Sequence, residues 1–152
     1  MRVLISALSC NANLGSEPSV GFHHAKAVAS SHQAVIVASP PCEAPQGAAL
    51  ATCNAGPCLF NDIEASALLR FELSQLRLAR QLHRQHHFQL VHRITPSATS
   101  HPTLLARLNL PLILGPVIGA DPPPPSFEPF MRRPGVLDPG KDSIQKFTQK
   151  AR

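Results

Sequence analysis

The sequence predicts an α/β fold in which helices flank a parallel β-sheet. Short apolar runs have the length of buried strands, and they lie near 2–8, 33–38, 88–92 and 111–114. Segments with helix-like spacing separate them, near 20–30 and 62–86, and parallel strands need such crossover connections. Because 152 residues with 43% hydrophobic content can bury one ordinary core, we expect one domain.

The first apolar run, Val3 to Leu8, is interpreted as a buried strand. A secretion signal needs about 7 to 15 apolar residues after its charged region, and this run is shorter and includes Ser6. The sequence also has no stretch near the length of about 18 apolar residues that a membrane span requires. We therefore expect a cytoplasmic protein, or one that is peripheral to the inner face of the membrane.

A turn-rich loop over 11–21 leads from this strand into the first helix. Gly15 allows a positive φ and close approach of a ligand to the backbone, and the free N–H groups of a helix N-terminus attract phosphate. Gly15 and Ser16 are therefore candidates for phosphate contact, or the segment is a simple tight turn. Glu17 could bind substrate hydroxyls, or it could be an acid that complements the helix dipole.

The second strand is expected at 33–38, and the segment 39–59 that follows it is expected to be a surface loop. That segment is rich in Pro, Gly, Ala and Cys and shows no sustained period, although a third strand would be expected there. Its cysteines, Cys42, Cys53 and Cys58, lack the paired C-x-x-C spacing of zinc sites. We expect free thiols, with no metal and no other cofactor.

The longest helix is expected over 61–86, with Asn61 or Asp62 as its N-cap. Four arginines lie along one side of it: Arg70, Arg77, Arg80 and Arg84. A solvated face is the ordinary interpretation, and lipid head groups or nucleic acid are the alternatives for a chain of net charge +5. The absence of aromatic interleaving argues against nucleic acid. His83 and His87 have a chelating spacing, but no acidic or cysteine ligand stands nearby.

The most informative stretch is 88–121, which reads as strand, helical segment over 101–108, and strand. In doubly wound sheets ligands bind beyond the carboxyl ends of the strands, which here means 92–96 and 115–121. His92, placed at the predicted end of a strand, could act as a general base or contact a substrate. It could equally be an orienting or core histidine.

These residues resemble the N-terminal domain of family 4 glycosyltransferases of the GT-B fold. The resemblance rests on Val91-His92, Thr95-Pro96 and the pattern Leu-Pro-x-x-x-Gly-Pro-Val-x-Gly at 110–119. The segment 7–22 is similar to that family's first strand and glycine-containing loop, so the match covers roughly residues 1–130. The chain departs from the family at Ile118 and Ala120, where the family has glycine, and at Gln89, where an acidic residue is common.

The resemblance implies a Rossmann-like domain over 1–121, the N-terminal half of a GT-B architecture, followed by a Pro-rich linker and basic tail over 122–152. It implies the acceptor-side part of a retaining, nucleotide-sugar-dependent glycosyltransferase that lacks its C-terminal donor-binding domain. The isolated chain would then be inactive. The alternative is a non-catalytic Rossmann-like module that binds a nucleotide or a partner chain.

The same resemblance implies three partners: a nucleotide-sugar donor, a saccharide or lipid acceptor, and the missing C-terminal domain. Peripheral contact with a membrane surface is instead an expectation from the net charge of +5 and the arginine side of the long helix, and nucleic acid is not expected. The resemblance assigns a catalytic role to His92. It assigns substrate binding to Gly15, Ser16, Glu17, Gly115 and Gly119, and it requires no metal.

Overall fold

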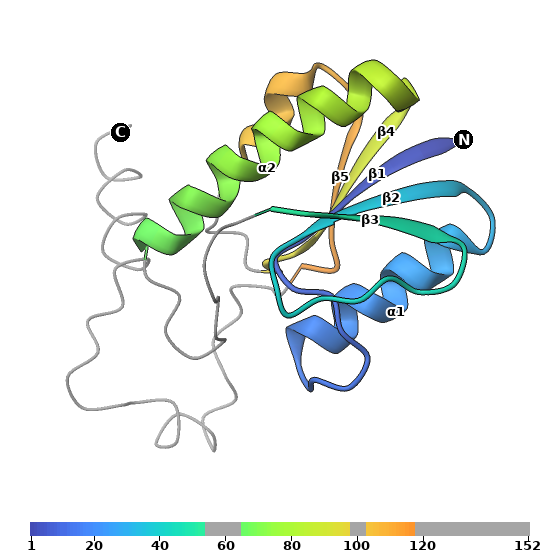
Figure 1. Ribbon diagram of the computed structural model, residues 1–152, viewed down its shortest axis with the longest axis vertical. Helices are drawn as coiled ribbons and strands as arrows, with labels where there is room; N and C mark the ends of the chain where they lie inside the picture. The colour runs from blue at the N-terminus through green and yellow to red at the C-terminus, as the bar shows by residue number, and fades with distance from the viewer. Residues whose placement is uncertain (54–64, 98–102, 118–152) are drawn as a thin grey trace, which may run out of the picture. The chain divides into compact units, whose positions relative to one another are not determined.

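The computed structural model describes residues 1–53, 65–97 and 103–117 (Figure 1). It has the predicted α/β fold, with five parallel strands in the order β3-β2-β1-β4-β5. The elements are β1 (Arg2–Ala7), α1 (Glu17–Ala29), β2 (Gln33–Ala38), β3 (Ala48–Thr52), α2 (Ala65–His86), β4 (Leu90–Thr95), the short 3₁₀ helix η1 (Leu104–Leu108) and β5 (Leu112–Leu114). The predicted N-cap at Asn61 or Asp62, the residues Ile118, Gly119 and Ala120, and the proposed linker and tail lie outside the described residues.

The central strands are buried on both faces, because α1 covers one face of the sheet and α2 with η1 covers the other (Figure 1). On β1, Val3, Ile5 and Ala7 belong to the core cluster on the α1 side, whereas Leu4 belongs to the cluster on the α2 side. Side chains of a strand alternate between the two faces, so a run with apolar residues at both even and odd positions fits a strand that is covered on both faces.

The structure corrects the prediction for 39–59, because β3 forms within that segment. β3 runs parallel to β2, with Ala34 opposite Ala48 and Ala38 opposite Thr52. Its sequence, Ala-Ala-Leu-Ala-Thr, has little intrinsic preference for a strand, and alanine is depleted in strands generally. Backbone pairing with β2 therefore determines this strand, and that contact is not visible in the local pattern.

Two boundaries also differ from the prediction. β4 runs from Leu90 to Thr95 rather than over 88–92, and Phe88 is a core residue that precedes the strand. α1 begins at Glu17, three residues before the predicted start, with Pro18 in its first turn where proline is tolerated. Of the predicted helical segment 101–108, the described part is the 3₁₀ helix η1, which the Thr103 side chain caps by accepting from the Leu105 N–H at 3.2 Å.

Candidate functional site

The strand order places the topological switch point between β1 and β4. The chain leaves β1 toward α1 on one face of the sheet, and α2 and η1 lie on the other face beside β4 (Figure 1). Ligands of doubly wound sheets bind in the crevice outside the carboxyl ends of the strands at such a point. The candidate site is therefore the region where residues 8–17 after β1 meet residues 96–97 after β4.

A carboxylate joins the segment after β1 to the segment after β4. The backbone N–H of Ser97 donates to Oε1 of Glu17 at 2.9 Å, and the Ser97 hydroxyl donates to the same oxygen. Ser97 is buried and Glu17 is partly buried, so water competes little for these hydrogen bonds. The first residue of α1 thus fixes the segment that follows β4, with one carboxylate oxygen engaged inside the chain.

The loop before α1 is more open than its sequence suggests. Gly15 and Ser16 are exposed, and a Cβ added at Gly15 would meet no atom within 4 Å. The positive φ of this loop falls on Ser16, at 62°, rather than on Gly15. The Ser16 side chain makes no capping hydrogen bond, and Pro18 removes one N–H donor from the first helical turn. The helix N-terminus therefore offers fewer donors to a phosphate than the sequence pattern predicts.

The close approach that requires glycine occurs at Gly21 instead. A Cβ at this position would lie 2.6 Å from the backbone oxygen of Ser9, closer than side chains come to carbonyl oxygens in folded proteins. Gly21 is buried and lets α1 pack against the loop that follows β1. Sequence reasoning missed this residue, because an isolated glycine in a helical pattern does not reveal which backbone it faces.

His92 lies within β4 rather than at its end. Its Nε2 atom is 2.8 Å from the carbonyl oxygen of Gly115, which follows β5. A carbonyl can only accept, so Nε2 carries the proton of the neutral ring and Nδ1 is the basic atom. Burial lowers the pKa of His92 below its ordinary 6.5; the Gly115 carbonyl opposes that shift and His24 adds to it. The ring is therefore neutral at pH 7, as a general base must be.

Of the predicted site residues, the structure brings together one pair, His92 and Gly115, and it joins Glu17 to Ser97, which was not predicted. Gly119 lies outside the described residues. Gly15 and Ser16 follow β1, which pairs with β4, so we predict that they lie on the same side of the site as His92.

Beside the crevice, on the α2 side of the sheet, lies a buried ion pair that the sequence analysis did not identify. Nη2 of Arg93 in β4 is 3.5 Å from Oε1 of Glu72 in α2, and both side chains are at most 5% exposed. The other oxygen of Glu72 accepts from the Leu104 N–H at 2.8 Å and from the Thr103 hydroxyl at 3.2 Å. Burial lowers the pKa of Arg93, while Glu72 and then Glu17 oppose that shift. Glu72 therefore connects α2, β4 and η1.

A second polar contact lies in the same layer. The Ser6 hydroxyl of β1 donates to Oε1 of Gln75 at 2.6 Å, and both residues are buried. The sequence held one signal for these groups: Glu72 and Gln75 occupy the same side of the helix as the core residues Phe71 and Ala79. A polar residue on the apolar side of a helix indicates a buried partner.

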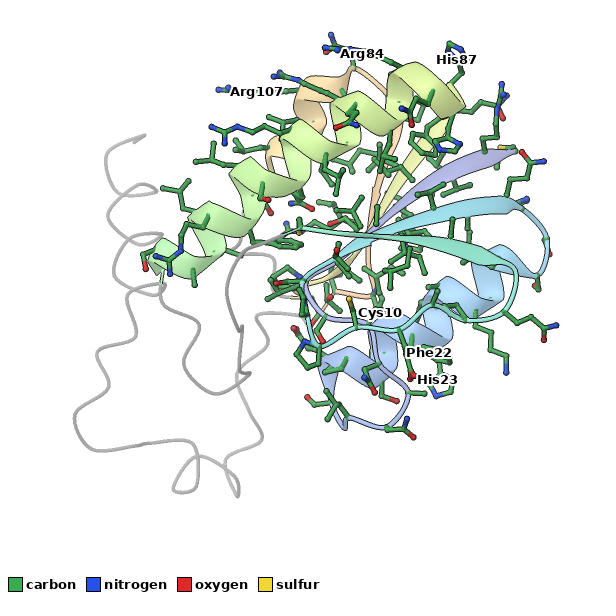
Figure 2. All side chains as sticks on the ribbon, in the orientation of Figure 1. Cys10, Phe22, His23, Arg84, His87 and Arg107 are labelled. Carbon is green, nitrogen blue, oxygen red and sulfur yellow. The ribbon has the colours of Figure 1, made fainter. Side chains whose placement is uncertain are left out.

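The loop that follows β1 also carries Cys10, a free thiol that is fully buried (Figure 2). Burial above all, with Cys42 and Glu43 adding to it, raises the pKa of this thiol to about 12. Because the thiolate is the nucleophile and the metal ligand, Cys10 is unreactive at neutral pH. Within 1–53, 65–97 and 103–117, no group of three or more His, Cys, Asp or Glu side chains is placed to hold a metal ion.

An open cavity of about 520 Å³ lies at the opposite end of the sheet, at the amino ends of the strands. Its lining includes Arg2, His32, Gln33 and Gln89. The Gln89 side chain there accepts from the backbone N–H of Arg2 at 3.0 Å. Since parallel sheets bind ligands at their carboxyl ends, this cavity is separate from the candidate site.

No family model matches this sequence, and no curated protein matches it. In the part of the chain that the structure describes, no helix is both long and apolar enough to cross a bilayer.

Proposed function

We propose that the chain is the N-terminal, acceptor-side part of a retaining, nucleotide-sugar-dependent glycosyltransferase, in which a second domain supplies the donor-binding wall. The observation that carries the proposal is the hydrogen-bonded contact of Glu17 with Ser97 at the switch point of the sheet. It holds the start of α1 against the segment after β4, the two segments that would border the proposed acceptor site. The sequence resemblance supplies the reaction class.

Each site residue has a role that fits its surroundings. Nδ1 of His92 contacts an acceptor hydroxyl and takes its proton, because Nε2 is held by the Gly115 carbonyl. Glu17 offers its second oxygen, Oε2, to another hydroxyl while Oε1 holds Ser97. The exposed backbone at Gly15 and Ser16 approaches the diphosphate of the donor. A cytoplasmic location goes with this proposal, since Cys10 and Cys42 are free thiols, as in reducing compartments.

A second candidate function is a non-catalytic module that binds a nucleotide or a partner chain. It is favoured because polar atoms that a catalyst would present to a substrate are hydrogen-bonded within the chain. One oxygen of Glu17 and one nitrogen of His92 are both hydrogen-bonded within the chain. Pro18 also removes one donor from the helix N-terminus.

The proposed site is tested by titrating the chain with nucleoside diphosphates and with neutral saccharides while backbone amide resonances are recorded. We expect shifts at Ser16, Glu17, Ser97 and Gly115, and weaker shifts in a Glu17→Gln variant. Lys26→Gln is the matched control, because Lys26 is exposed elsewhere on α1. Shifts confined to Arg2, His32 and the other residues of the amino-end cavity would contradict the proposed site.

A further inference from the structure

The outer side of α2 carries arginines and leucines together. Leu69 is 57% exposed and Leu73 is 43% exposed, although both are large apolar side chains. The arginines of α2 are all exposed as well. We name the set the Arg/Leu face, and it consists of Leu69, Arg70, Leu73, Arg77, Arg80 and Arg84.

These six residues share one narrow strip of the helix. At about 100° per residue they fall within an arc of about 100°, and they extend over about 22 Å of helix length. The core residues Phe71 and Ala79 lie on the opposite side, against the sheet. The two leucines of the strip therefore face away from the core; Arg70 lies between them in sequence, and Arg77, Arg80 and Arg84 follow them along the helix.

No acidic side chain of α2 balances the positive charge of the strip. The only acidic residue of α2 is Glu72, which is buried and paired with Arg93. The adjoining η1 adds Arg107, which is exposed, and Figure 2 shows Arg84 and Arg107 extending from the same side of the domain. Five guanidinium groups thus gather over two adjacent elements.

We propose that the Arg/Leu face docks on the surface of a bilayer that contains anionic phospholipids. Basic side chains bind the lipid phosphates, and Leu69 and Leu73 enter the boundary between head groups and acyl chains. The proposal does not depend on sugar transfer. It requires only that α2 lie flat on the membrane with its core side still packed on the sheet.

Other occupants fit the face less well. A second copy would bring the same net charge of +5, and in the segment 122–152 Lys and Arg also outnumber Asp and Glu. Nucleic acid would satisfy the arginines, but it would leave both leucines in water, and the chain has no Trp or Tyr to stack on bases. An anionic bilayer matches the charge and the apolar side chains at once.

The test is sedimentation of the 1–152 chain with vesicles of phosphatidylcholine, with or without phosphatidylglycerol. We expect binding to the anionic vesicles that weakens as salt rises. Arg80→Gln should lower the partition coefficient about fivefold, and Arg77→Gln, Arg80→Gln and Arg84→Gln together about a hundredfold. Replacing Leu69 and Leu73 with Gln should lower it about tenfold. Lys26→Gln on the opposite face of the sheet is the control and should change nothing.

All of these positions are exposed, so circular dichroism should show the wild-type fold in every variant. Equal binding to neutral vesicles would overturn the proposal, and so would wild-type binding by the triple arginine variant or by the leucine variant. Tighter binding of duplex DNA than of anionic vesicles at the same salt would replace it with the nucleic-acid interpretation.

Discussion

At the scale of single residues, close contacts decide which of the chain's chemistry-bearing groups have a structural role. Gly21 faces the carbonyl oxygen of Ser9, whereas Gly15 faces open space. The Nε2 atom of His92 is fixed by the Gly115 carbonyl. Gly21 therefore has a packing role that Gly15 lacks. In the same way, Nε2 of His92 has a structural role that Nδ1 does not share.

Gly21→Ala should destabilise the fold by about 1–2 kcal/mol. Alanine gains up to about 1 kcal/mol over glycine in a helix interior, but a Cβ at 2.6 Å from Ser9 would force α1 away from the loop. Overpacking of this kind costs about 1–3 kcal/mol and outweighs the gain. Gly15→Ala is the control and should stay within about 0.5 kcal/mol in urea unfolding. Equal stability of the two variants would show that α1 and the Ser9 carbonyl can move apart without a cost in stability.

His92 should make the free energy of unfolding depend on pH. Burial lowers the pKa of His92 in the folded state below its ordinary 6.5, so the unfolded chain binds more protons as the pH falls. Stability should therefore be full above about pH 6.5 and should decline as the pH drops from there toward the folded-state pKa. Urea unfolding at a series of pH values measures this decline.

His92→Gln is the matching variant, because its amide can still donate to the Gly115 carbonyl but does not titrate. The variant should lose the part of the pH dependence that His92 supplies. The same decline in both proteins would assign the pH dependence to other groups.

At the scale of elements, α2 is held to the sheet by more than apolar contact. Glu72 receives hydrogen bonds from η1 and lies against Arg93 of β4, and Gln75 receives one from Ser6 of β1. Polar groups that are buried among apolar side chains fix the position of a helix more narrowly than leucines alone, provided that they keep their partners.

Glu72→Gln should cost about 3 kcal/mol, because it removes the carboxylate that neutralises the buried Arg93 guanidinium. The double variant Glu72→Gln with Arg93→Met should recover part of that loss, since no buried charge then remains at the pair. Chemical unfolding of the four proteins of the cycle gives the coupling energy, which should exceed about 1 kcal/mol. Additive losses would mean that the two charges do not interact.

At the scale of the whole molecule, the described residues form one wall of the proposed cleft. Sugar transfer requires that the donor be positioned against the acceptor and that the charge on the leaving diphosphate be stabilised. The proposal assigns the second of these tasks largely to another domain.

The isolated chain should therefore not transfer sugar at a useful rate. The measurement is an assay of purified 1–152 with a panel of nucleotide sugars and with saccharide or lipid acceptors, with and without a supplied donor-binding domain. His92→Gln should lower the rate of the combined system by about 10²-fold or more, as the loss of a general base does. Comparable turnover by 1–152 alone would contradict the two-domain proposal, and a combined system without turnover would favour the non-catalytic module.

Much of the fold was already determined by the sequence. Two signals are local: the apolar runs of β1 and β2, and the 3.6-residue period of α2. A strand that is buried on both faces has consecutive apolar residues, and a helix that is buried on one side has apolar residues at helical spacing. The parallel sheet follows from the order of those signals. The position of the arginines on one side of α2 could be predicted for the same reason, since residues at helical spacing share a face.

Only the tertiary structure decided the rest, because it depends on contacts between residues far apart in the chain. β3 forms because its alanine-rich segment pairs with the edge of β2, and Glu72 meets Arg93 because the two side chains lie on the same face of the sheet. The exposure of Leu69 and Leu73 depends on where α2 sits on the sheet. A sequence shows which residues can be buried. Long-range packing decides which of these residues become buried and which side chains they contact.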